Sequence, residues 1–299
     1  VKLNYGIDYG DGTRHFNPIP NTWFKMLNIL RFWAGKGVDG FRCDMAHMVP
    51  LEFWNWAISA VKEHYPDIIF IAEIYDVNLY RDYIKVGQFD YLYDKVNLYD
   101  TLRGIQCSNF SAARITNCWQ TVEGIGENML NFLENHDEQR FGSKQYAGDP
   151  GLVIPSLVIS SMISTGPMMI YAGQELGEQA NDAEGYSGLD GRTTIFDYWS
   201  IPTVCRWFNN GKCDSSLLSE REIWLRSIYQ AILTILRSVV NGFLQFGRLA
   251  NFVVTAPPFS DLPKTGDTIV INNAWQADYI DQVRSVTVYG KLYIQQPSK

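Results

Sequence analysis

Short, largely apolar segments alternate with amphipathic helical patterns along the first 240 residues, and this alternation constrains the fold more than any other feature. Five segments have the length and composition of buried strands: residues 38–43, 68–73, 89–92, 129–133 and 167–171. Strands that are apolar on both faces are typical of parallel sheets that are covered by helices. The alternation therefore predicts an α/β fold with about five parallel strands.

Patterns of helical length lie between and after these segments. Asn21 or Thr22 is expected to cap the first helix, because both side chains can accept a hydrogen bond from a free backbone N–H. Residues 98–105 fit either a helix or a loop. The clearest helical patterns cover residues 23–34, 50–63, 78–85, 152–163 and 220–239.

The longest apolar run, residues 152–172, is nearly long enough to cross a membrane. Pro155 and Pro167 interrupt it, and a serine-rich stretch lies between them. We therefore interpret this run as a buried helix, a turn and a buried strand.

The composition changes after Gly242, where β-rich segments follow one another without intervening helices. These segments are residues 252–254, 268–271 and 285–294, and the last is expected to form a hairpin. We predict two domains, one over residues 1–241 and a small all-β domain over residues 242–299.

The charge and composition exclude some classes of partner. The net charge is −7 and the Lys and Arg residues are scattered, so we expect no binding to nucleic acid or to an anionic membrane. Aromatic residues make up 14% of the chain, which suits core packing and also a sugar-binding cleft. The odd number of five cysteines leaves the redox compartment open, although Cys107 with Cys118 and Cys205 with Cys213 could bridge locally.

Three of the predicted strands end on an acid: Asp44, Glu73 and Asp137. The carboxyl ends of strands are where α/β folds gather their active sites, and buried acids are costly unless they are paired or used. Arg42 and Asp44 lie on one face of the first strand, because side chains alternate along a strand. A structural ion pair at a strand end is the alternative interpretation of that pair.

Two carboxyl groups that face a sugar linkage would make a complete mechanism. Asp44 beside the Arg42 guanidinium suits a nucleophile, because a nearby positive charge favours the ionised carboxylate. Glu73 is expected to stay protonated as the general acid, because burial and neighbouring acids disfavour its charged form. Asp137 would then hold sugar hydroxyls and favour an oxocarbenium-like state.

These residues lie in motifs that resemble the signatures of the α-amylase family of glycoside hydrolases, in the family's order. The resemblance covers about residues 22–239, and three motifs in register are far more specific than one. The three motifs are Gly40-Phe41-Arg42-Cys43-Asp44, Phe70-Ile71-Ala72-Glu73-Ile74-Tyr75 and Glu134-Asn135-His136-Asp137. The later Ile170-Tyr171-Ala172-Gly173-Gln174-Glu175 resembles the family's last barrel strand and its loop.

The resemblance implies a (β/α)8 barrel that acts on α-glucosidic linkages with retention of configuration. It implies that Asp44 is the nucleophile, Glu73 the acid/base and Asp137 the transition-state stabiliser. It also implies that Arg42 orients Asp44 and that His136 binds a sugar hydroxyl. Strict strand alternation would separate His136 from Asp137, so both reach the pocket only if the strand has ended before them.

Other residues near these motifs are weaker candidates. His47 lies three residues past the nucleophile, where the resemblance implies contact with the leaving side of the substrate; a packing role is equally compatible. Tyr75 and Trp199 are candidate sugar platforms, with core packing as the alternative. Asp190 and Arg192 are interpreted only as turn residues on a loop near the same face.

The chain also departs from the family's pattern. The first signature and the first strands of the barrel are absent, and five strands cannot close an eight-stranded barrel. We interpret the chain as the carboxyl-terminal part of a larger enzyme, whose missing barrel half is the expected partner. The family's calcium site is expected to lie largely in that missing region, so bound calcium stays an open expectation.

The leading hypothesis is an α-amylase-type hydrolase that cleaves α-1,4 linkages of starch-like glucans. A cyclomaltodextrinase, a neopullulanase or a transglycosylase with the same acids is the close alternative. A non-catalytic, amylase-like binding subunit is the alternative from a different class. The sequence does not fix the compartment, for which a secreted or periplasmic location is preferred.

Overall fold

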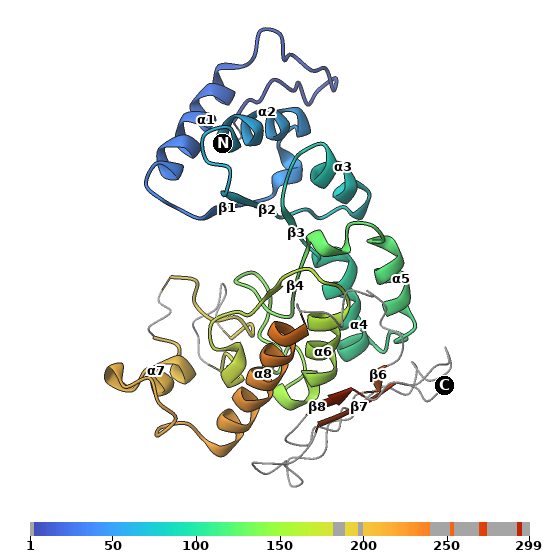
Figure 1. The fold of residues 1–299 in the computed structure, drawn as a ribbon, viewed down its shortest axis with the longest axis vertical. Helices are drawn as coiled ribbons and strands as arrows, with labels where there is room; N and C mark the ends of the chain where they lie inside the picture. The colour runs from blue at the N-terminus through green and yellow to red at the C-terminus, as the bar shows by residue number, and fades with distance from the viewer. Residues whose placement is uncertain are drawn as a thin grey trace. The chain divides into compact units, whose positions relative to one another are not determined.

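The computed structural model describes residues 3–181, 189–196 and 200–239, together with the backbone of three short strands further along the chain (Figure 1). Helices and strands alternate through most of this length, as the sequence predicts. The helices are α1 (Asn21–Ala34), α2 (Leu51–Lys62), α3 (Tyr80–Lys85), α4 (Asp100–Ser108), α5 (Arg114–Thr121), α6 (Ile154–Met162), α7 (Pro202–Phe208) and α8 (Glu220–Val239). The strands are β1 (Gly40–Cys43), β2 (Ile69–Ala72), β3 (Tyr91–Tyr93), β4 (Met129–Phe132), β5 (Met168–Met169), β6 (Phe252–Val253), β7 (Ile269–Asn273) and β8 (Leu292–Ile294).

Strands β1 to β5 form a parallel sheet in chain order, which confirms the predicted α/β class. Gly40 pairs with Ile69 at the start of β1, and Leu92 of β3 pairs with Met129 of β4. Gly40 cannot carry a side chain, because a Cβ there would lie 2.6 Å from the Ile69 carbonyl oxygen. The glycine therefore permits the close approach of β1 and β2.

The chain divides into two compact units. The first unit comprises Val1–Val96 and Val122–Leu130, and the second comprises Asn97–Thr121 and Asn131–Lys299. Strand β4 contributes to both, since its first two residues pair with β3 and its last two pair with β5.

The first unit has an aromatic core beneath α1 and α2, which lie side by side (Figure 1). Trp23 of α1 meets Phe53 of α2 at a ring distance of 5.6 Å, and Trp54 meets Phe89 at 5.0 Å. Phe70 of β2 is fully buried among these rings. Burial of such large side chains is the main source of stability for the helix layer on these strands.

The second unit packs α6 against α8. Gln174, just after β5, donates a hydrogen bond of 2.9 Å to the buried Tyr229 hydroxyl of α8. The apolar run 152–172 forms the predicted buried helix and a short strand, but the two residues of that strand are half-buried rather than buried. Within the described part of the chain, no helix is both long enough and apolar enough to cross a membrane.

The predicted cap of α1 is wrong. The helix already begins at Asn21, and the capping position is Pro20, which has no side-chain donor or acceptor for the free N–H groups. Pro20 instead fixes the extended backbone that leads into the helix. The five cysteines are free in this structure, so neither local bridge forms.

The carboxyl-terminal region is described only through three strands. Strand β7 pairs with β6 in an antiparallel and with β8 in a parallel arrangement. The predicted domain boundary near residue 242, and most of the predicted hairpin over 285–294, lie outside the described residues. The small all-β domain therefore stays a prediction.

Candidate active site

Arg42 and Asp44 lie where β1 ends, on the face that strand alternation predicts. Arg42 Nη1 contacts Asp44 Oδ1 at 2.5 Å. The Asp44 side chain is 75% exposed, whereas we expected buried acids at the strand ends. Strand β1 stops at Cys43, so Asp44 already belongs to the loop and faces solvent.

Glu73, directly after β2, is a buried acid of the first unit, with only 2% of its side chain exposed. Its Oε1 contacts Arg42 Nη2 at 2.8 Å and accepts a hydrogen bond of 2.9 Å from the Tyr75 hydroxyl. Its Oε2 accepts a hydrogen bond of 2.9 Å from the Met45 backbone N–H. Glu73 thus meets three donors in this unit, and one of them, Arg42, also contacts the neighbouring acid Asp44.

The Arg42 guanidinium therefore bridges Asp44 and Glu73. Burial lowers the pKa of Arg42, but the hydrogen bond to Asp44 and the charge of Glu73 outweigh burial and raise it above its ordinary value. The guanidinium also lies over the Tyr93 ring, with 5.3 Å between Cζ and the ring centroid. A permanently charged group thus orients both carboxylates at once.

Backbone hydrogen bonds tie the ends of β1 and β2 together around this bridge. The Glu73 N–H donates to the Cys43 carbonyl at 3.1 Å, and the Ala46 N–H donates to the Glu73 carbonyl at 2.9 Å. The turn between them places Met45 in the left-handed region, with φ of 42°. Sequence analysis did not find this role of Met45, because a backbone N–H leaves no signal in the residue type.

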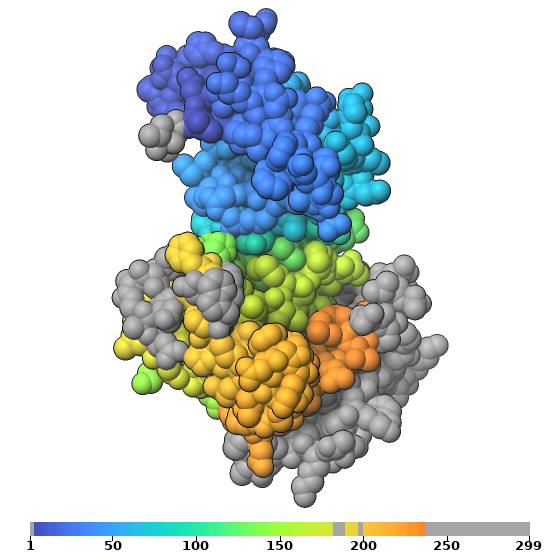
Figure 2. Space-filling view, turned by 90° about the vertical axis from the view of Figure 1, so that its left-hand side faces the viewer, coloured from blue at the N-terminus to red at the C-terminus, as the bar shows by residue number. Residues whose placement is uncertain are grey.

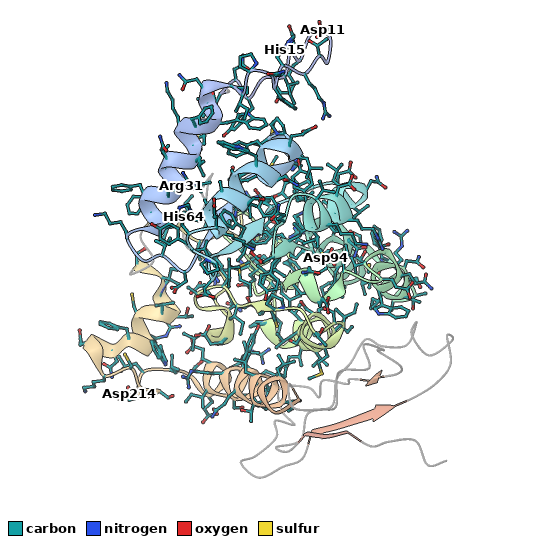
Figure 3. The ribbon with its side chains drawn as sticks, turned by 45° about the horizontal axis from the view of Figure 1, so that its top comes forward. Asp11, His15, Arg31, His64, Asp94 and Asp214 are labelled. Carbon is teal, nitrogen blue, oxygen red and sulfur yellow. The ribbon has the colours of Figure 1, made fainter. Side chains whose placement is uncertain are left out.

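His47 and Tyr75 lie beside the same group. Their ring centroids are 6.0 Å apart, and His47 Nδ1 is buried without a hydrogen-bond partner among the described residues. The other histidines of this unit are elsewhere: His15 lies in the amino-terminal loop and His64 just after α2 (Figure 3). Of the sugar platforms predicted, Tyr75 is near the acids, and Trp199 lies outside the described residues.

Asp94 is an acid at a strand end that sequence analysis missed. It follows β3, is 3% exposed, and lies within the side chains of the first unit (Figure 3). The Tyr80 hydroxyl lies 3.5 Å from its Oδ1, and the Asp94 N–H donates to the Leu130 carbonyl at 3.1 Å. The pattern of an apolar strand followed by an acid, already used for Glu73, would have found it.

In the second unit, His136 and Asp137 lie in the loop after β4. That strand ends at Phe132, so the predicted condition that both residues follow the strand is met. His136 Nε2 and Asp137 Oδ2 are 3.3 Å apart. Asn135 Oδ1 accepts hydrogen bonds of 2.9 Å from the backbone N–H groups of Asp137 and Glu138, and these bonds shape the loop.

A fully buried ion pair anchors the same loop. Glu134 Oε2 accepts a hydrogen bond of 2.8 Å from Arg140 Nη1, and Glu134 Oε1 accepts one of 2.8 Å from the Phe141 N–H. Burial raises the pKa of Glu134 above its ordinary value, while Arg140 opposes that rise. Sequence analysis named Glu134 only as part of a motif and missed Arg140 altogether.

The candidate residues thus form two groups, one in each unit. Arg42, Asp44 and Glu73 make up one, together with Tyr75 and His47 beside them. His136 and Asp137 make up the other. The roles that the sequence assigns to these residues stay predictions. Within the described residues, no cluster of three or more His, Cys, Asp or Glu side chains could hold a metal ion, and calcium remains an expectation.

Comparison with known proteins identifies the family to which this chain belongs. The model of the α-amylase catalytic domain matches residues 19–195, which is more than half of the chain. The chain belongs to the α-amylase family. The match includes the motifs that carry Arg42, Asp44, Glu73, His136 and Asp137, so the recognition made from those motifs is confirmed.

Two family relatives are α-1,4-glucan:maltose-1-phosphate maltosyltransferases. The enzyme of Rhodospirillum rubrum is 47% identical over 53 residues, which are 18% of this chain and 8% of the relative. That of Mycolicibacterium smegmatis is 29% identical over 182 residues, covering 57% of this chain and 23% of the relative. The chain therefore spans less than a quarter of the length of these relatives.

A solved cyclomaltodextrinase has a similar fold, with a TM-score of 0.54 and 18% identity. The likeness covers 82% of this chain and 38% of that chain. The parallel sheet thus belongs to the TIM-barrel-type fold of α-amylase-family enzymes, as predicted. Enzymes of this family act on glycosidic bonds by hydrolysis or by transfer.

Proposed function

We propose that this chain carries the catalytic acids of a retaining enzyme that cleaves α-1,4-glucosidic linkages of starch-like glucans. The observation that carries the proposal is the Arg42 guanidinium, which contacts Asp44 at 2.5 Å and Glu73 at 2.8 Å. One exposed and one buried carboxyl group at adjacent strand ends are the pair that a double displacement needs.

In the first step, an Asp44 carboxylate oxygen attacks the anomeric carbon while Glu73 donates a proton to the leaving oxygen. The α-linkage breaks, and a β-linked glycosyl ester of Asp44 forms. In the second step, Glu73 takes a proton from water, whose oxygen attacks the same carbon and releases Asp44. Two inversions give a product with the original α-configuration.

The remaining residues would act on the sugar around this reaction. Asp137 and His136 would hold hydroxyl groups of the sugar and favour the positive charge that develops on the ring. Tyr75 would orient Glu73 through its hydroxyl and offer its ring to the substrate. His47, beside that ring, would contact the leaving side of the glucan.

Glycosyl transfer is the second candidate, and the similarity to the maltosyltransferases favours it. In that reaction an acceptor sugar hydroxyl, rather than water, gives its proton to Glu73 and attacks the ester. The acids and the first step are the same in both reactions. Access of water to the Asp44 ester therefore decides between hydrolysis and transfer. A binding subunit without activity is the third, non-catalytic candidate.

Product analysis distinguishes these candidates. The chain is incubated with soluble starch, pullulan, cyclodextrins, and maltose 1-phosphate with a glucan acceptor. Hydrolysis gives new reducing ends, whereas transfer lengthens the acceptor. We expect Glu73→Gln to lower turnover at least about 100-fold, because it removes general acid/base catalysis. Glu127→Gln, an exposed change in the same unit, is the matched control.

Azide tests the individual roles. With Asp44→Gly and an α-glycosyl fluoride, azide replaces the missing nucleophile directly and should give the β-azide. With Glu73→Gln, azide should attack the Asp44 ester and give the α-azide. Full activity of Glu73→Gln would overturn the acid assignment, and glucan binding without turnover would support the binding subunit.

We also propose a partner that would complete the barrel of the whole protein. The expected partner is a chain or segment that supplies the remaining barrel units, because among the described residues β1 pairs with β2 alone. Calcium would be expected on that supplied part, since the described residues offer no cluster for it.

A further inference from the structure

The loop that carries Asp137 is held by a short segment of the second unit, residues 189–193, which we call the clamp segment. The Arg140 N–H donates to the Gly191 carbonyl at 2.7 Å. Arg192 Nε donates to the backbone carbonyl of Asp137 at 2.6 Å. Gln145 Nε2 donates to the Leu189 carbonyl at 2.9 Å. The segment thus contacts the Asp137 loop at three points along its length.

Glycine is required at the centre of the clamp segment. Gly191 has φ of 84°, a conformation that side chains rarely adopt. A Cβ at this position would lie 2.7 Å from Gln145 Oε1 and 2.8 Å from Ser143 Oγ. The backbone of the clamp segment therefore lies directly against the loop, with no room for an intervening side chain.

The buried Arg140 fixes the end of the clamp segment. Its Nη2 and Nε donate to Thr193 Oγ1 at 2.8 Å and 3.1 Å, while its Nη1 binds Glu134. Its guanidinium lies 4.0 Å from the centre of the Tyr171 ring. Arg140 thus anchors both Glu134 and the end of the clamp segment.

Arg192 is different, because its contact is with Asp137 itself. Asp190 orients the guanidinium: Asp190 Oδ1 accepts from the Arg192 N–H at 3.0 Å, and Asp190 Oδ2 accepts from Nη1 at 3.2 Å. With the guanidinium held in this way, its Nε donates to the Asp137 carbonyl. Rotation of the Asp137 backbone, and with it the direction of its carboxylate, is thereby restricted.

We propose that Arg192 is a positioning residue that holds Asp137 for transition-state stabilisation. Asp190 orients the Arg192 guanidinium, and Gly191 lets the clamp segment lie against the loop. The catalytic consequence rests on the proposed function, in which Asp137 stabilises positive charge on the sugar ring. Such stabilisation depends on preorganised groups, and a small displacement can cost about 100-fold in rate. Loss of a group that acts in this way lowers kcat more than it raises KM.

The test compares Arg192→Ala and Arg192→Lys in the 299-residue chain. We expect Arg192→Ala to lower kcat on a maltooligosaccharide by about 10- to 100-fold with KM changed less than about threefold. Arg192→Lys should recover part of the loss, because an ammonium group can still donate one hydrogen bond. Arg114→Ala, an exposed change in the same unit, should leave kcat unchanged.

Amide hydrogen exchange gives a readout that needs no activity. Arg192→Ala should accelerate exchange at the backbone amides of residues 137–141, and Arg114→Ala should not. Unchanged exchange at these amides, or a loss of thermal stability with normal kcat, would overturn the proposal. If the intact parent protein were inert on every α-glucan, the proposed function would fail, and the exchange result alone would decide the placement of Asp137 by Arg192.

Discussion

Met45 lies between the two acids of the first unit and connects them through its backbone. Its φ of 42° belongs to the left-handed region, which costs a residue with a Cβ about 1–2 kcal/mol. In this conformation the Met45 N–H donates a hydrogen bond of 2.9 Å to Glu73 Oε2. Strain of this kind persists where the surrounding structure fixes the backbone, and it is concentrated at functional sites.

Replacement of Met45 tests this conformation. We expect Met45→Val to destabilise the chain by about 1–2 kcal/mol more than Met45→Asn, because asparagine tolerates the left-handed region and a β-branched residue does not. Urea unfolding measures the difference. Met48→Val, three residues away and without a left-handed backbone, is the control. Equal stability of the valine and asparagine variants at this position would contradict the expectation.

At the scale of elements, the alternation of apolar strands and helices predicts the parallel sheet and places Asp44 and Glu73 just after β1 and β2, although Asp94 after β3 was missed. The apolar composition of a strand and the spacing of apolar residues along a helix depend only on neighbouring residues, so both can be found in the sequence. The donors around Glu73 could not be predicted, because Tyr75 and Met45 reach it only through the geometry of two loops. The pairing of Arg140 with Thr193 likewise joins residues far apart in the chain.

Helix α8 begins with a capping box that stabilises the second unit in a pH-dependent way. The Ser219 N–H donates to Glu222 Oε2 at 2.7 Å, the Ser219 hydroxyl lies 2.9 Å from the same oxygen, and the Glu222 N–H donates to Ser219 Oγ at 3.3 Å. Burial raises the pKa of Glu222, but hydrogen bonds from Arg206 and Ser219 outweigh burial and lower it below the ordinary value of 4.5.

Because the pKa of Glu222 is lower in the folded chain, its stabilising effect is present above the ordinary value and is lost as the pH falls through the folded value. We expect Glu222→Gln to cost about 1 kcal/mol at pH 7 and progressively less below about pH 4. Thermal unfolding across this pH range measures the change. Glu220→Gln, an exposed change in the same helical turn, is the matched control, and a constant cost for Glu222→Gln at every pH would contradict the assignment.

On the scale of the whole molecule, the first unit presents an apolar helix face to solvent. Figure 2 looks onto the side of this unit that carries α1. Phe24, Ile29, Phe32 and Trp33 of that helix are each between 47% and 57% exposed. Ile29, Phe32 and Trp33 are neighbours at helical spacing, and the rings of the last two meet at 5.3 Å. Contiguous apolar surface of this kind favours association.

We therefore expect the 299-residue chain to self-associate as its concentration rises. The net charge of −7 opposes association through repulsion, so added salt should strengthen it. The double change Ile29→Gln with Trp33→Gln should shift the chain towards the monomer, since it removes the apolar contact while keeping residues that suit a helix. Sedimentation velocity over a range of concentrations measures the effect. Leu217→Gln, at a similarly exposed apolar residue of the second unit, is the matched control; association that is equally strong in both variants would place the responsible surface elsewhere.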